Sequence, residues 1–166
     1  MQKTKVVTIV ASVAYFCLLM WVIIFKCNLL TSDLRFGYRS INLVPFDKIA
    51  NVGHFFDYLL NVVVYVPTGF YVCAFLKDKP IAHKIFVIAL SSILFEVVQY
   101  AIALGSTDIS DVISNTLGGV VGLWLYCKTK NCRFFNIFNL CMIFVGIPLV
   151  IFAVVHTASV FSIYLS

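Results

Sequence analysis

The segment Phe95–Gly122 constrains this chain more than any other. It is apolar enough to lie in a membrane, yet it carries Glu96, Gln99, Asp108, Asp111 and Asn115. Placing an Asp at the centre of an inserted helix costs roughly 3 kcal/mol. Two helices do not need this many polar groups to hold together. The segment therefore predicts a polar site built on a helical hairpin, with the rest of the chain positioning it.

The composition places this hairpin in a membrane protein. Of 166 residues, 62% are hydrophobic and only 11% are charged, whereas soluble domains average about 25% charged residues. The length predicts one integral membrane domain, residues 1–166. The net charge of +5 does not indicate a nucleic-acid partner, because the basic residues fall in short loops between apolar segments.

Five apolar segments follow one another along the chain. They are Val6–Phe25, Tyr58–Leu76, Ile85–Leu104, Ile109–Tyr126 and a final segment that begins near Phe134. The first four are each about as long as the roughly 20 residues that cross a bilayer, and the last is longer. The first is longer than a signal-peptide core and lacks a cleavage site after it, so we expect an uncleaved helix. The fold class is predicted to be all-α, a polytopic bundle of about five transmembrane helices.

The basic residues indicate how these helices are oriented. With a cytoplasmic N-terminus, eight Lys and Arg residues lie inside and four lie outside, all four in the loop Lys26–Phe56. This excess favours a cytoplasmic N-terminus and an external C-terminus. The loop contains the apolar sequence Asn42–Phe46 around Pro45, which we expect either on the membrane surface or folded back over the bundle.

Helical periodicity gathers the polar residues into one stripe per helix. The stripes contain Asp57, Asn61, Tyr65 and Thr68; then Ser92, Glu96 and Gln99; then Asp108, Asp111, Asn115, Gly118 and Gly122. A tight turn at Gly105–Thr107 would join the last two helices, so that Glu96 and Asn115 both lie about 14 Å below it at about 1.5 Å per residue. This predicts a hydrogen bond between Asn115 and Glu96 in an extracytoplasmic cleft, with Asn61 facing it.

Structural roles compete with site roles at several of these positions. Asp108 suits the N-cap of a helix, and capping and a site role can coexist. Gly118 and Gly122 suit close helix packing. The three histidines are dispersed, the six cysteines form no CxxC pair, and we expect neither a bound metal nor a cofactor.

The polar motifs together resemble the VanZ-like family of bacterial membrane proteins. The matching pieces are Asn42-Leu43-Val44-Pro45-Phe46, Asn61 with Pro67-Thr68-Gly69-Phe70, Phe95-Glu96-Val97-Val98-Gln99, Thr107-Asp108-Ile109-Ser110-Asp111 and Asn115-Thr116-Leu117-Gly118-Gly119. Their order and spacing make the resemblance specific over residues 42–122.

The resemblance implies a multi-pass protein of the bacterial cell membrane that confers resistance to glycopeptide antibiotics with a lipid tail, such as teicoplanin. It transfers no catalytic residue. The presumed binding residues are the motif positions Asn42, Pro45, Asn61, Glu96, Gln99, Asp108, Asp111 and Asn115.

Three kinds of function fit these features. The first is a binding protein for the antibiotic or a lipid-linked cell-wall precursor. The second is an enzyme acting on an envelope lipid, with Glu96, Asp108 and Asp111 as acid and base or as Mg²⁺ ligands; the hairpin offers no Lys or Arg to grip phosphate. The third is a transporter, for which five helices without an internal repeat are few unless the protein oligomerises.

Overall fold

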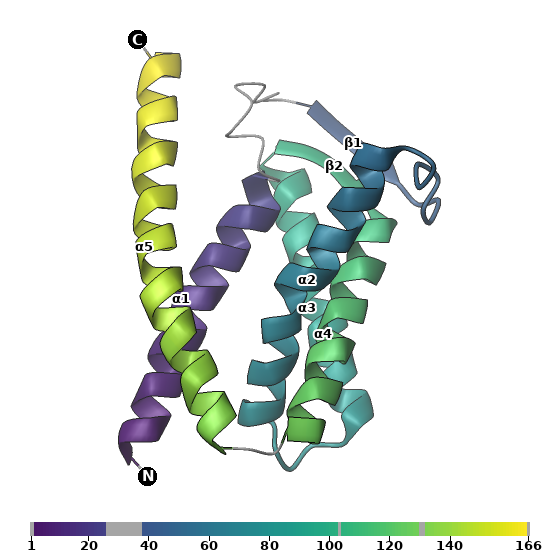
Figure 1. Cartoon of the computed structure of the whole chain (residues 1–166). Coiled ribbons are helices and arrows are strands. Elements are labelled where there is room, and N and C mark those ends of the chain that lie inside the picture. Colours follow the sequence, from purple (N-terminus) through teal and green to yellow (C-terminus); the bar gives the residue numbers. More distant parts are fainter. Residues whose placement is uncertain (1, 26–37, 103, 130–131, 166) are drawn as a thin grey trace. The chain divides into compact units, whose positions relative to one another are not determined.

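The computed structural model describes residues 2–25, 38–102, 104–129 and 132–165. Within them the chain forms five helices and two short strands (Figure 1). In order these are α1 (Gln2–Phe25), β1 (Tyr38–Asn42), α2 (Val52–Phe75), α3 (Ile81–Ala101), β2 (Leu104–Asp108), α4 (Ile109–Thr129) and α5 (Cys132–Leu165). The predicted all-α membrane architecture is confirmed.

Four helices are long and apolar enough to cross a membrane. The qualifying segments of the described chain are Lys5–Ile23, Val52–Phe75, Ile81–Ala101 and Phe134–Ser159. Helix α4 is of similar length but is not among them. Its first turns carry Asp111 and Asn115, and glycines follow, so polar and small residues lower its hydropathy.

Helices α1 and α5 form one compact unit. The Asn139 amide of α5 donates to the Thr8 hydroxyl of α1 over 3.0 Å. Farther along both helices, the Trp21 indole N–H donates to the Thr157 hydroxyl over 2.9 Å. In both helices the residue of the second contact lies farther from the N-terminus than the residue of the first. Helices α1 and α5 therefore run parallel to one another. Hydrogen bonds of this kind hold helices together where lipid provides no hydrophobic driving force.

The second unit, residues 35–130, contains α2, α3, α4 and both strands. Helices α2 and α4 approach closely at their glycines. A Cβ on Gly118 would collide with the carbonyl oxygen of Val62, and one on Gly122 with that of Val66. The predicted packing role of these glycines is confirmed, and the partner is α2.

The two strands were not predicted. Strands β1 and β2 pair in parallel, with Asn42 opposite Asp108, and residues 105–107 therefore belong to a strand rather than to the tight turn expected at Gly105–Thr107. The predicted turn was wrong because strands of five residues leave no clear periodic signal. They form only where two segments distant in sequence supply each other's backbone partners.

Helix α2 also begins earlier than the expected Tyr58. The Asn51 side chain caps it by accepting hydrogen bonds from the backbone N–H groups of Gly53, over 2.9 Å, and His54, over 3.4 Å. Asn is among the favoured N-cap residues. Residues 52–56, assigned to the loop from the sequence, therefore belong to the first turns of the helix.

Candidate functional site

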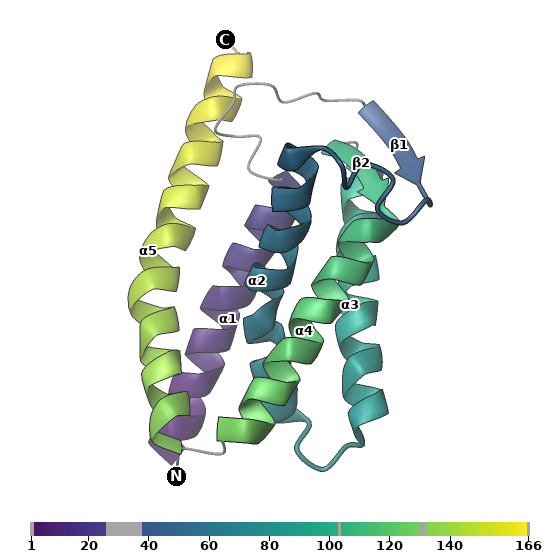
Figure 2. The same cartoon turned by 45° about the vertical axis from the view of Figure 1, so that its right-hand side comes forward.

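The polar stripes meet at one end of the second unit. The start of α2, the end of α3, the start of α4 and the strand pair all lie at this end (Figure 2). Buried polar residues gather here; from α3, β2 and α4 they include Ser92, Glu96, Gln99, Asp108, Ser110, Asp111, Ser114 and Asn115. We call the interbonded side chains and backbone groups at this end the polar cluster.

Asp108 lies at the junction between β2 and α4. One carboxylate oxygen accepts the backbone N–H of Ser110 over 2.8 Å, which is the geometry of an N-cap. The other oxygen accepts the Asn42 amide over 3.0 Å, so the cap also ties β1 to α4. The capping role proposed from the sequence is confirmed, and the same carboxylate makes a tertiary contact.

Glu96 holds this junction from α3. It is the only glutamate in the chain and its side chain is buried. Its Oε2 accepts the backbone N–H of Asp108 over 3.0 Å, and the Thr107 hydroxyl donates to its backbone carbonyl over 3.2 Å. In a capping box a glutamate of the same helix accepts the N-cap N–H; here the glutamate comes from a neighbouring helix.

Asn115 does not bond to Glu96 as predicted. Its amide donates to the Ser92 hydroxyl over 2.9 Å, and both side chains are buried. The expected hydrogen bond was wrong because equal depth does not fix which partner a side chain reaches. Ser92 lies one helical turn from Glu96. The Glu96 carboxylate instead accepts the backbone N–H of Asp108, just before α4.

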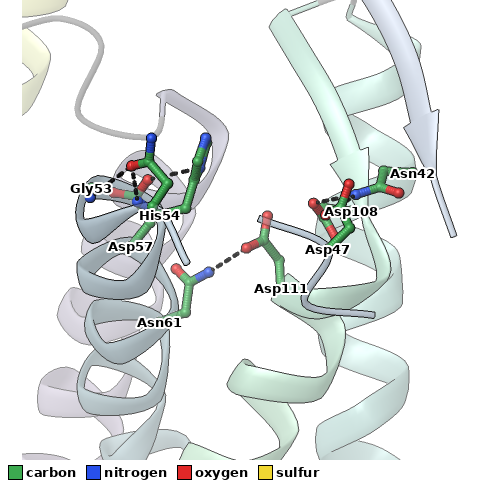
Figure 3. Close-up of polar contacts among 9 residues, drawn as sticks. Asn42, Asp47, Gly53, His54, Asp57, Asn61, Asp108 and Asp111 are labelled. Carbon is green, nitrogen blue, oxygen red and sulfur yellow. Dashed lines mark hydrogen bonds and ion pairs between the residues drawn. The ribbon is translucent and has the colours of Figure 1, made fainter. Parts of the chain in front are cut away.

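Asn61 links α2 to α4. Its amide donates to Asp111 Oδ1 over 2.7 Å (Figure 3), within the short range typical of charge-assisted bonds. The predicted convergence of these two residues is confirmed. Asp57, assigned to the same stripe, instead has an exposed side chain 3.6 Å from the His54 imidazole.

The segment after β1 folds onto the start of α4. Asn42 donates to Asp47 over 2.9 Å as well as to Asp108 (Figure 3), and its Oδ1 accepts the backbone N–H of Val44. Phe46 adopts a left-handed backbone conformation, with φ of 54°. Its N–H donates to the Ser110 hydroxyl over 2.9 Å, and its ring packs edge-on against Tyr58.

The remaining candidates differ in position. Gln99 is fully buried on α3, whereas Pro45 is exposed in the loop. Sequence reasoning missed the roles of Asp47 and Ser110. Ser110 lies in a quoted motif, but nothing in the sequence indicated that its hydroxyl would accept a backbone N–H from residue 46.

The bonding pattern defines what the cluster does chemically. The acidic side chains of Glu96, Asp108 and Asp111 accept hydrogen bonds from backbone and amide N–H groups. Among the described residues, no three His, Cys, Asp or Glu side chains are grouped as metal ligands. The cluster fastens the β1–β2 pair and the adjoining loop to three helices.

Comparison with known proteins extends these observations. The family model described as VanZ/LLP1 matches residues 12–139. Over 143 residues the chain is 33% identical to a protein of Enterococcus faecium called Protein VanZ, covering 86% of this chain and 87% of that protein. No solved structure matches the chain. The matched region includes the complete polar cluster.

Proposed function

This chain belongs to the VanZ/LLP1 family, and from that premise we propose that it confers resistance to lipid-tailed glycopeptide antibiotics from the bacterial cell membrane. Resistance would arise without a catalytic step. The end of the second unit that carries the polar cluster binds the antibiotic or a lipid-linked envelope component. This binding lowers the antibiotic's access to its cell-wall target.

One observation carries the proposal: the motif residues of the family resemblance converge. Asn42, Asn61, Asp108 and Asp111 come from four different elements, β1, α2, β2 and α4, and bond within one cluster. The cluster holds an exposed loop in one shape. Binding residues are often on loops that a rigid scaffold positions in this way. We therefore assign ligand contact to the loop and the strand pair, and positioning to the buried carboxylates.

We assign this end to the outer face of the membrane. Helices α1 and α5 are parallel, so if both cross the membrane the chain between them crosses an odd number of times. Helices α2 and α3 supply two crossings, and α4 is the third. With the N-terminus inside, as the basic residues favour, the polar cluster lies at the outer leaflet, where lipid-tailed antibiotics and wall precursors meet the protein.

Binding accounts for the polar cluster better than catalysis does. Oxygens of Glu96, Asp108 and Asp111 accept hydrogen bonds that shape the backbone at the start of α4 or join it to α2. A general acid or base must instead reach the proton of a substrate. The enzyme alternative predicts that E96Q and D111N lose all resistance with normal folding; a hydrogen-bonding role predicts partial retention.

The decisive experiment expresses the chain in a susceptible Gram-positive host. We expect reduced susceptibility to teicoplanin and little change for vancomycin. We compare the teicoplanin susceptibility of D111N with that of D57N, at equal membrane levels of the two variants. D57N is the control because Asp57 is exposed and outside the cluster. Purified protein in nanodiscs is then tested for binding of teicoplanin and of lipid-linked wall precursor. Absence of both binding signals would overturn the binding mechanism.

A further inference from the structure

The loop between β1 and α2 carries apolar side chains on its outside. Leu43 is 72% exposed and Val44 60% exposed; Ile49 of the same loop and Ile41 at the end of β1 are also exposed. Pro45 lies among them, likewise exposed. Soluble surfaces rarely expose contiguous apolar patches of this kind, and such patches mark contact with a partner or a membrane.

The inner side of the same loop is polar and firmly bonded. Asn42 donates to Asp47 and Asp108, and the backbone N–H groups of Val44 and Phe46 both have side-chain acceptors. Its turns close with backbone bonds from Ile49 to Phe46, 3.1 Å, and from Asn51 to Lys48, 2.9 Å. These bonds give the backbone N–H groups of Val44, Phe46, Ile49 and Asn51 an acceptor within the protein, which lowers the cost of placing the loop in lipid. The apolar side chains are exposed.

The exposed apolar surface continues onto α2. Val52 is 70% exposed, and Phe55 and Phe56 follow on the first turns of this helix. Helix α2 is long and apolar enough to cross the membrane, so its exposed apolar side chains face acyl chains. The loop residues extend this lipid-facing surface past the start of the helix.

Basic and aromatic side chains flank the apolar loop. The Arg39 guanidinium lies 5.6 Å from the centre of the Tyr100 ring and donates to the Ala101 carbonyl over 3.1 Å. Lys48 is exposed and follows the apolar residues Leu43–Pro45 in the sequence, whereas Arg39 precedes them. Tyrosines and cations at the level of lipid headgroups are typical of residues that anchor a segment at the interface.

We infer that the segment Ile41–Ile49, which comprises the end of β1 and the loop after it, inserts its apolar side chains into the lipid leaflet beside the polar cluster. The occupant of this surface is lipid, with acyl chains against Leu43 and Val44 and headgroup phosphates near Arg39 and Lys48. One consequence rests on the proposed function: a ligand of this site approaches through the bilayer, so its lipid tail is part of what the protein recognises.

Single-tryptophan variants of the full chain in nanodiscs test the insertion. The chain has two tryptophans, which W21F and W124F remove, and V44W or L43W adds a reporter. The control is D78W, in the exposed turn between α2 and α3. We expect V44W and L43W to emit at shorter wavelength than D78W, to be quenched by lipids brominated near the headgroup, and to resist aqueous iodide.

Emission and iodide quenching at Val44 and Leu43 equal to those at Asp78 would overturn the insertion. Because W21F removes the bond to Thr157, a second measurement retains both native tryptophans and uses a spin label on V44C in a background without other cysteines. Greater accessibility to oxygen than to aqueous nickel supports insertion, and the reverse refutes it. Neither readout uses antibiotic resistance, so failure here is distinguishable from failure of the proposed function.

Discussion

Glu96 accepts the backbone N–H of Asp108, and through this bond helix α3 caps the point where β2 becomes α4. The bond is 3.0 Å long and buried. It joins the one acidic side chain of α3 to Asp108, which caps α4 and also accepts the Asn42 amide. This junction therefore helps to hold the loop in the proposed binding surface, together with the bond from Phe46 to Ser110.

Replacing Glu96 separates hydrogen bonding from acid–base chemistry. E96Q keeps a side-chain oxygen that can accept the Asp108 N–H, so we expect near-normal stability and partial teicoplanin resistance. E96A leaves the buried N–H without this acceptor, which costs about 1–3 kcal/mol. SDS-induced unfolding in mixed micelles measures stability. Loss of resistance in E96Q with unchanged unfolding would favour the enzyme alternative.

The Asn61–Asp111 pair should be energetically coupled. Residues in direct hydrogen-bond contact show coupling energies of about 0.5–3 kcal/mol, and this 2.7 Å bond is partly buried. A double-mutant cycle with N61A and D111A on unfolding free energy checks the expectation. The exposed His54–Asp57 pair provides the control, where we expect about 0–1 kcal/mol. Equal coupling in the two cycles would contradict the structure.

Glycine substitutions test the close approach of α2 and α4. In G118A the new Cβ meets the Val62 carbonyl, and overpacking of this kind costs about 1–3 kcal/mol. The matched control is G146A on α5, where the new Cβ would lie 3.8 Å from the Ala14 Cβ, an ordinary contact. We expect a clear fall in thermal stability for G118A alone. A tolerated G118A would show that the two backbones are farther apart.

Cysteine labelling tests the orientation and the crossing by α4. In a background without native cysteines, K48C, K79C and K128C report three exposed positions. We expect a membrane-impermeant maleimide to label K48C in intact cells, and K79C and K128C only after permeabilisation. Labelling of K128C from outside would mean that α4 does not cross. The opposite pattern at positions 48 and 79 would invert the orientation.

Sequence patterns anticipated the helices and most participants of the cluster, but neither the two strands nor most of the bonds. Periodicity placed Asn61 and Asp111 on converging faces, and they bond. The same reasoning paired Asn115 with Glu96, whereas Ser92 is the partner. Spacing along a helix defines a face and a depth, yet a hydrogen bond requires a separation near 3 Å and good alignment, which depend on helix rotation and on the neighbouring backbone.

By itself, the sequence determined that the chain is a helical membrane protein with polar residues concentrated in Phe95–Gly122. Apolar length and the cost of polar groups in lipid are local properties, so composition and periodicity reveal them. Only the tertiary structure decided that β1 pairs with β2, that Asn42 reaches Asp108, and that Glu96 serves the backbone of α4. These contacts join segments far apart in the chain, and no local signal encodes which distant backbone or side-chain group will satisfy a buried polar atom.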